Sequence, residues 1–215
     1  MSTAHTHKHH GHSHNHGRDH HGNPKDFANY LKRLESPERD AWQQPQRVIK
    51  ALKLGRGDTV AEVGAGPGYI SLRLAKAVGP KGRVFAVEVE PKMLAVLGER
   101  LVAAKTINLT PVLGLLERPL LPHRSLDHVL LVNTFHHFHD GVAYLKELAR
   151  CLRPQGRISV VDFHDREMPM GPPPEEKISR DACVTLAKRA GLTLVAEQTF
   201  LEYQYFLTFA ATARA

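Results

Sequence analysis

From Thr59 onward, the sequence alternates between short apolar runs and segments whose apolar residues recur at helical spacing. The apolar runs are predicted to be strands, at 59–63, 84–89, 109–113, 128–132 and 158–163. The other segments are predicted to be helices, at about 69–78, from 91, at 142–152 and at 179–190. Such alternation is typical of a largely parallel sheet with helices on both faces. The sequence therefore predicts a doubly wound α/β domain.

The last two predicted strands, near 192–199 and 203–210, differ from the others in how they are connected. Only Phe200, Leu201 and Glu202 join them. Parallel neighbours need a crossover of about a dozen residues or more. This final pair is therefore predicted to be antiparallel.

Residues 1–23 stand apart in composition. The chain has 15 histidines, and most lie in this segment among Gly, Ser, Asn and Asp, with no apolar residue to anchor a core. Such a segment is predicted to be a disordered tail. Imidazoles bind Zn, Ni and Cu, so weak metal binding is one hypothesis for the tail, and a solvated segment without a metal role is the other. The candidate ligands are His9, His10, His12, His14 and His16.

Residues 24–54 are predicted to be a helical segment in three pieces, interrupted at Ser36–Pro37 and at Gln44–Pro45. The aromatic residues of this segment form either a lid over a binding site or ordinary core packing. They are Phe27, Tyr30 and Trp42. The main domain is predicted to span 55–215.

Composition favours one domain in a reducing compartment. Hydrophobic residues make up 42% of the 215, and no apolar run is long enough for a membrane span. The N-terminus has no apolar core of a secretory signal. Cys151 and Cys183 are isolated in sequence, which indicates a cytoplasmic protein without a disulfide framework. The net charge of +7 comes from scattered basic residues, so a nucleic-acid partner is not expected.

A glycine-rich turn follows the first predicted strand. It contains Gly64, Gly66 and Gly68, which place no Cβ between the backbone and a ligand, and Ala65 lies between the first two. A strand, a glycine turn and a helix N-terminus form a nucleotide-type cradle. The dinucleotide fingerprint would need a glycine at position 69, where this chain has Tyr69. Glu88 ends the second strand, where an acidic side chain can accept hydrogen bonds from ribose hydroxyls.

Four segments in the same order resemble the motifs of class I S-adenosylmethionine-dependent methyltransferases, of the small-molecule type found in ubiquinone and menaquinone biosynthesis. Residues 60–68 resemble the first motif and residues 84–94 the second. Residues 120–130 resemble the segment entering strand four, and 152–158 the turn before strand five. The resemblance covers about 40–212. It implies a Rossmann-like, seven-stranded sheet in the order 3-2-1-4-5-7-6, with the last strand antiparallel.

The resemblance also implies S-adenosylmethionine as the methyl donor and gives roles to individual residues. Gly64, Ala65 and Gly66 would line the methionine and ribose, with Gly68 in the same loop, and Glu62 would hold the amino-acid end. Glu88 would bind the ribose hydroxyls, and Val89 and Met93 would pack near the adenine. The family often has an acidic residue where this chain has Leu115, which leaves the adenine amino group to backbone atoms or to Glu117.

Methyl transfer is an in-line displacement in which the protein mainly aligns donor and acceptor. A general base is needed only if the acceptor must lose a proton. Side chains that follow strands four and five are the candidates for this work. His136, His137 and His164 are candidate bases, or else they cap helix ends or fill the wall of the site. Asn133 is a candidate contact to the donor or the acceptor.

The sequence thus predicts an enzyme that transfers a methyl group from S-adenosylmethionine to a small-molecule acceptor. A nicotinamide-dependent oxidoreductase is disfavoured by Tyr69 and by the antiparallel final pair. A non-catalytic or metal-handling protein that keeps the fold is the remaining alternative.

Overall fold

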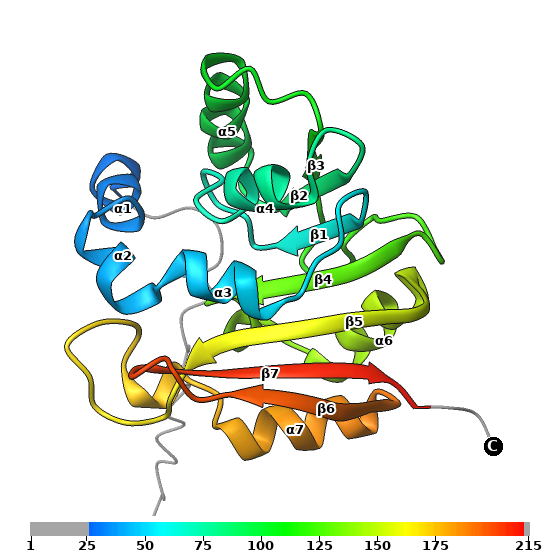
Figure 1. Ribbon diagram of the computed structural model, residues 1–215. Coiled ribbons are helices and arrows are strands. Elements are labelled where there is room, and N and C mark those ends of the chain that lie inside the picture. The colour runs from blue at the N-terminus through cyan, green and yellow to red at the C-terminus, as the bar shows by residue number, and fades with distance from the viewer. Residues whose placement is uncertain (1–25, 213–215) are drawn as a thin grey trace, which may run out of the picture.

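The computed structural model describes residues 26–212, which form a seven-stranded sheet with helices on both faces (Figure 1). The strand order is β3-β2-β1-β4-β5-β7-β6. Strand β7 is antiparallel to both of its neighbours, and the other strands pair in parallel. The predicted fold, strand order and antiparallel final pair are therefore confirmed. The strands are β1 (Thr59–Val63), β2 (Arg83–Glu88), β3 (Leu109–Leu113), β4 (Leu126–Val132), β5 (Leu152–Phe163), β6 (Leu192–Gln198) and β7 (Gln204–Ala211).

Several helices begin where a polar side chain caps the first turn. Asp26, Asp140 and Ser179 each accept a hydrogen bond from the backbone N–H three residues on. Pro45 and Pro91 occupy first helical positions, where a missing N–H costs nothing. The α-helices are α1 (Phe27–Leu34), α2 (Glu38–Gln43), α3 (Pro45–Ala51), α4 (Ser71–Val78), α5 (Pro91–Ala103), α6 (Gly141–Cys151) and α7 (Arg180–Arg189); short 3-10 turns lie at Phe135–His137 and Pro174–Glu176.

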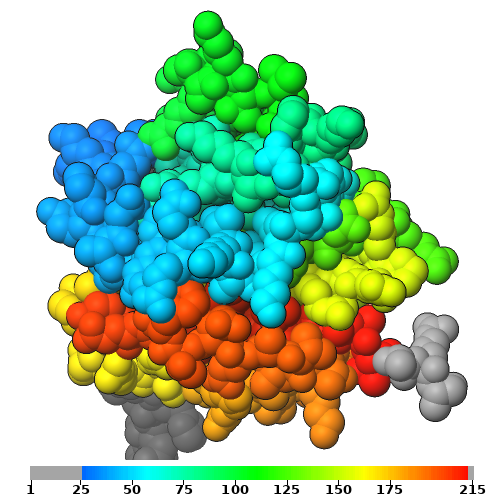
Figure 2. Space-filling model, in the orientation of Figure 1, coloured from blue at the N-terminus to red at the C-terminus, as the bar shows by residue number. Residues whose placement is uncertain are grey.

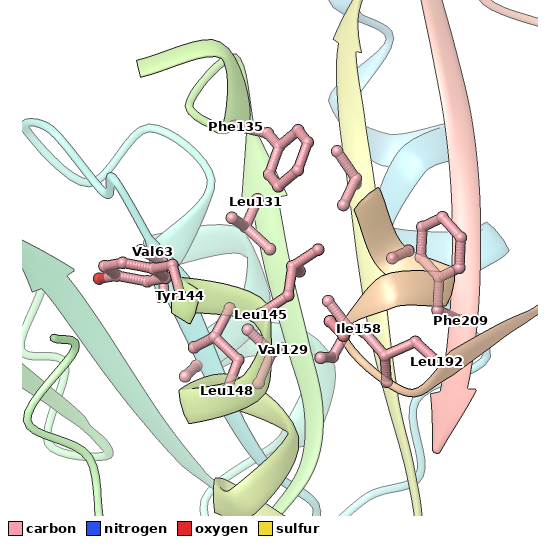
Figure 3. Close-up of a cluster of buried hydrophobic side chains, with 14 of the residues drawn as sticks. Val63, Val129, Leu131, Phe135, Tyr144, Leu145, Leu148, Ile158, Leu192 and Phe209 are labelled. Carbon is pink, nitrogen blue, oxygen red and sulfur yellow. The ribbon is translucent and has the colours of Figure 1, made fainter. Parts of the chain in front are cut away.

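Alternate residues of the central strands feed two separate cores. Val63, Val129 and Leu131 lie on the face that α6 and α7 cover, and Figure 3 shows this cluster closing around Tyr144 and Leu148 of α6. The neighbouring residues of the same strands point to the other face, where they pack against α3, α4 and α5. Because both faces are buried, the inner strands are almost continuously apolar, as the sequence indicated.

Strand β5 begins earlier than predicted. Residues 154–156 were expected to form a turn before a strand at 158, but β5 starts at Leu152, directly after α6. Leu152 pairs with Leu126, and pairing then shifts so that Arg157 pairs with His128. The residues between form a bulge, where Pro154 removes no ladder hydrogen bond. A Cβ on Gly156 would lie 2.9 Å from the carbonyl oxygen of Leu126, so a glycine permits this close approach.

The N-terminal helices lie at the edge of the sheet where the parallel strands end. In Figure 1, α1 and α2 border the carboxyl ends of β1 and β4, and the loop between β5 and α7 reaches the same edge. In the space-filling view, the blue surface of these helices lies directly against the rest of the domain (Figure 2). Ligands of open α/β sheets bind at this edge. Among the helices of residues 26–212, none has the length and apolarity needed to cross a membrane.

Candidate functional site

The three glycines of the turn after β1 have different environments. All three have positive φ: 76° at Gly64, 53° at Gly66 and 88° at Gly68. A Cβ on Gly64 would collide with the side chain of Thr134, and one on Gly68 would collide with Leu97 of α5. A Cβ on Gly66 would find only a Leu34 methyl group, at 3.8 Å. Gly64 and Gly68 are therefore explained by packing, and Gly66 is the glycine that leaves space for a ligand.

The carboxylate of Glu88 is held beside Gly66. Its Oε2 accepts a hydrogen bond from the Gly66 N–H at 2.8 Å. Its Oε1 accepts from the N–H groups of Val89, at 2.7 Å, and Glu90, at 3.1 Å. An ionised carboxylate can accept about four hydrogen bonds, so one position, on Oε2, remains for a hydroxyl group of a ligand.

Glu62 is a buried carboxyl directly under the glycine turn. It lies in β1 and is 2% exposed, and its Oε2 accepts a hydrogen bond from the hydroxyl of Ser71 at the start of α4. Burial raises the pKa of Glu62 to about 8, and the hydrogen bond from Ser71 and the nearby charge of Arg39 reduce that rise. At neutral pH this carboxyl is therefore mostly protonated until a cation arrives beside it.

Helix α1 covers the cradle. The side chain of Leu34 approaches Gly66, and Glu35, which follows the helix, forms an ion pair with Arg100 of α5. Burial raises the pKa of Tyr30, and the charge of Glu88 raises it further. The Nζ atom of Lys92 lies 5.9 Å from the ring centre of Phe27. Phe27, a candidate for either the lid or the core, thus lies against the first turn of α5.

The remaining predicted donor contacts lie around the end of β2 and the turn after β3. Val89 is half-buried and Met93 is buried in the first turn of α5. Leu115 is 49% exposed, and its backbone pairs with Arg118 in a tight turn. Glu117 in that turn is also exposed.

The candidate base His136 is held by a carboxylate. Its Nδ1 lies 2.7 Å from Oδ1 of Asp162, and its backbone N–H donates to Oδ2 of the same residue at 3.1 Å. Asp162 ends β5 and also accepts from the N–H of Phe163, at 2.8 Å. The two side chains are 4% and 2% exposed. A proton on Nδ1, shared with Asp162, leaves the lone pair of His136 on Nε2.

The other two histidines have different surroundings. His137 is exposed, and its ring centre lies 4.0 Å from that of His136. The ring of His164 packs near Tyr205, with the centres 6.1 Å apart. Burial, together with the charge of Arg166, lowers the pKa of His164. Trp42 contributes to the His136 end of the site, because its ring centre lies 5.9 Å from that of Phe163.

Asn133 belongs to a buried ring of three amide side chains. Asn133 donates to Gln43 of α2 at 3.1 Å, Gln43 donates to Gln204 of β7 at 2.7 Å, and Gln204 donates back to Asn133. Asn133 has φ of 55°, a conformation that asparagine tolerates better than most residues. The ring fixes Asn133 between the N-terminal helices and the last strand.

Sequence reasoning missed four residues of this edge: Arg39, Gln43, Asp162 and Gln204. A charged or amide side chain inside a buried strand, as at 162 and 204, is the signal that could have found two of them. The two on α2 carried no comparable signal.

Comparison with known proteins agrees with this geometry. A family model described as a methyltransferase domain matches residues 60–156. The crystal structure of an S-adenosylmethionine-dependent methyltransferase from Aquifex aeolicus superposes with a TM-score of 0.80 at 28% identity, and the match covers 84% of this chain and 96% of that one. The chain is a class I S-adenosylmethionine-dependent methyltransferase.

Two curated relatives are also named as methyltransferases. An uncharacterized methyltransferase of Bacillus subtilis (strain 168), YdaC, is 28% identical over 154 residues, which are 72% of this methyltransferase and 80% of the relative. A demethylmenaquinone methyltransferase of Listeria monocytogenes serotype 4a (strain HCC23) is 26% identical over 125 residues. That match spans 58% of this methyltransferase and about half, 52%, of the relative.

The residues at the edge fit the donor of this family. Gly66 leaves room next to the backbone, the Glu88 carboxylate has one free acceptor position, and Glu62 is a buried acid without an ion pair. The methyltransferase has no cluster of three or more metal-ligand side chains within residues 26–212. The predicted tail ligands, His9, His10, His12, His14 and His16, lie outside the described residues.

Proposed function

We propose that this methyltransferase transfers the methyl group of S-adenosylmethionine to a small-molecule acceptor. The observation that carries the proposal is the Glu88 carboxylate, held by three backbone N–H groups beside the open position at Gly66. In this proposal Glu88 binds the ribose and Glu62 the ammonium group. The other donor contacts come from Gly64, Ala65, Gly66, Gly68, Val89, Met93 and Asn133, with Leu115 near the adenine.

The donor, when bound, supplies a methyl group that its sulfonium centre has already activated. The protein then has to align the acceptor and keep water out. We infer that residues 24–54 act as the lid of the main domain, 55–215. This is supported by the contacts of α1 with the glycine turn and of Trp42 with Phe163.

His136 is the histidine best placed to remove a proton from the acceptor. Asp162 holds its Nδ1 side, so Nε2 is the atom that would accept the proton. The same arrangement stabilises the imidazolium that forms. In this proposal His137, which is exposed beside His136, and His164, whose ring packs near Tyr205, line the site rather than act as bases.

The side chains around His136 favour a flat acceptor molecule that carries a removable proton. Trp42 and Phe163 offer aromatic surface beside His136. A hydroxyl or an acidic C–H on an aromatic or quinone-like ring would match both the surface and the base. The demethylmenaquinone methyltransferases among the relatives are consistent with this class of acceptor.

Two further expectations accompany the proposal. Both cysteines are buried and unpaired, which supports the expectation of a cytoplasmic protein. The histidine-rich residues 1–23 remain a prediction of weak Zn, Ni or Cu binding. Comparing zinc uptake by the full chain with that of a chain starting at Asn23 tests it, because equal uptake would remove the tail as the metal site.

Calorimetric titration with S-adenosylhomocysteine tests the proposed function, with NAD as the control ligand. We expect saturable binding of S-adenosylhomocysteine alone. Loss of a hydrogen bond to a charged group costs about 1.5–3 kcal/mol, so Glu88→Ala should weaken binding by roughly 10- to 100-fold. Glu99→Ala, at an exposed carboxylate of α5, is the matched control. Absence of binding to the parent protein would favour the non-catalytic alternative, and binding of NAD would favour the oxidoreductase.

A further inference from the structure

Arg39 is a buried cation that the proposed function has not yet used. It lies in α2 and is 9% exposed. Its Nη1 donates to the carbonyl oxygen of Leu34 at 2.9 Å, and its guanidinium lies 4.0 Å from the ring centre of Tyr69. Its Nε is buried and has no hydrogen-bond partner among the described residues. No carboxylate of residues 26–212 forms an ion pair with it.

The neighbouring Arg73 also has a buried Nε without a hydrogen-bond partner among the described residues, but unlike Arg39 it has an ion-pair partner. Arg73 also stacks on Tyr69, at 4.3 Å from the ring centre. Its Nη1 donates to the carbonyl oxygen of Tyr69 at 2.6 Å, and its Nη2 pairs with Asp40 at 3.2 Å. Asp40 therefore neutralises Arg73, and Arg39 keeps its positive charge in a buried place. Such a charge is costly unless an anion joins it.

The acid whose charge reaches Arg39 is Glu62. Arg39 stacks on Tyr69, and Glu62 accepts a hydrogen bond from Ser71, two residues further along, so both groups lie beneath the same turn; the charge of each also shifts the pKa of the other. Glu62 is bonded to Ser71, however, and burial keeps it mostly protonated near pH 7. Arg39 also donates to the backbone carbonyl of Leu34, and the side chain of Leu34 approaches the open position at Gly66, so one residue connects the guanidinium with the open part of the cradle.

We propose that Arg39 binds the α-carboxylate of the methionyl group while Glu62 binds its α-ammonium group. This inference rests on the proposed function, since it assumes that the donor lies in the cradle. A zwitterion has one charge of each sign, and this pair of side chains complements both. A guanidinium also matches a carboxylate in shape, because two of its N–H groups can donate in parallel.

The assignment makes α2 part of the donor site. The donor then supplies the anion that the buried Arg39 lacks, and its carboxylate links the N-terminal helices to the glycine turn. It also predicts selectivity. S-adenosylhomocysteine has the carboxylate, whereas 5′-methylthioadenosine has the same adenosine and thioether without the amino-acid end.

The test measures how well the full-length protein separates these two ligands by calorimetry. We expect Arg39→Met to weaken S-adenosylhomocysteine binding by at least about tenfold, as for a lost hydrogen bond to a charged group. Binding of 5′-methylthioadenosine should change by less than about twofold, which also shows that the variant is folded. Arg73→Met is the matched control, because it removes the other arginine from Tyr69. It should leave the ratio of the two affinities unchanged.

The outcomes distinguish a failure of the proposed function from a failure of the role proposed for Arg39. If the parent protein fails to bind S-adenosylhomocysteine, the proposed function itself is wrong. If the parent binds and Arg39→Met binds equally well, only the role of Arg39 is wrong. Equal weakening of both ligands would mean that Arg39 acts through packing on Tyr69, which also overturns the inference.

A measurement on the parent protein covers the case in which Arg39→Met does not fold. The decarboxylated analogue of S-adenosylhomocysteine keeps the ammonium group and lacks the carboxylate. It should bind at least about tenfold more weakly than S-adenosylhomocysteine. Equal affinity would refute a carboxylate site at Arg39.

Discussion

Replacing Glu62 with glutamine should change how the stability of the ligand-free protein depends on pH. Burial raises the pKa of this carboxyl from its ordinary 4.5 to about 8 in the folded protein. Between these values the folded state holds the proton more tightly than the unfolded chain. The protonated carboxyl therefore favours folding below pH 4.5, and this contribution is lost as the pH rises to about 8.

The size of the effect follows from the width of this window. One pKa unit corresponds to about 1.4 kcal/mol, so the full window is worth about 5 kcal/mol. Between pH 5.5 and 7.5 the loss is about 2.5 kcal/mol. Glutamine cannot ionise, and its amide oxygen can still accept the hydrogen bond from Ser71. The free energy of unfolding of Glu62→Gln should therefore lack this part of the pH dependence.

Urea unfolding at the two pH values, followed by far-ultraviolet circular dichroism, measures the difference directly. The parent should lose about 2.5 kcal/mol more than Glu62→Gln between pH 5.5 and 7.5. The contributions of the other titrating groups to this difference cancel because both proteins contain those groups. Glu99→Gln, which changes an exposed carboxyl of α5, should follow the parent. If Glu62→Gln also followed the parent, Glu62 would not be a buried acid that holds its proton near neutral pH.

Three further outcomes are expected. At pH 7, binding of S-adenosylhomocysteine should release close to one proton from the parent and none from Glu62→Gln. Calorimetry in buffers of different ionisation enthalpy measures this release. Equal release from both proteins would remove Glu62 as the ammonium site. Gly64→Ala should destabilise the protein in urea by at least about 1 kcal/mol more than Gly191→Ala. Both positions have positive φ, but only the first lacks room for a Cβ, so equal costs would contradict the packing argument. In Asp162→Asn, nitrogen-15 spectra of His136 should lose the preference for a proton on Nδ1, and an unchanged spectrum would show that Asp162 does not set the tautomer.

The sheet could be predicted from the sequence because each strand carries a local signal. Runs such as 59–63 and 128–132 are buried on both faces, so they are mostly apolar, and the short link at 200–202 permits only an antiparallel pair. The start of β5 was missed because the bulge at 153–156 contains the turn residues Pro154 and Gly156. Only the pairing of Leu152 with Leu126 shows that the strand has already begun.

The site was less accessible to prediction, because its decisive contacts join distant parts of the chain. The spacing of the glycines located the turn but did not separate Gly66, which leaves space, from Gly64 and Gly68, which are packed. The sequence offered no reason to prefer one of the three histidines near the two strand ends as the base. Only the structure shows that the Nδ1 side of His136 faces the carboxylate of Asp162. No sequence pattern marked Arg39, because its role depends on which charged groups lie beside it in the folded protein.

The ring of amides has a consequence for the order in which parts of the protein fold during synthesis. Gln43 and Gln204 are 161 positions apart in the chain, yet they share a hydrogen bond next to Asn133. Contacts of such long sequence separation form late, because the loop between them must be closed first. On the ribosome, α2 is synthesised before β7 and has to wait for it. The nascent chain can therefore pack much of its sheet before α2 acquires this anchor, and the competence to hold a donor should be gained only after β7 has emerged.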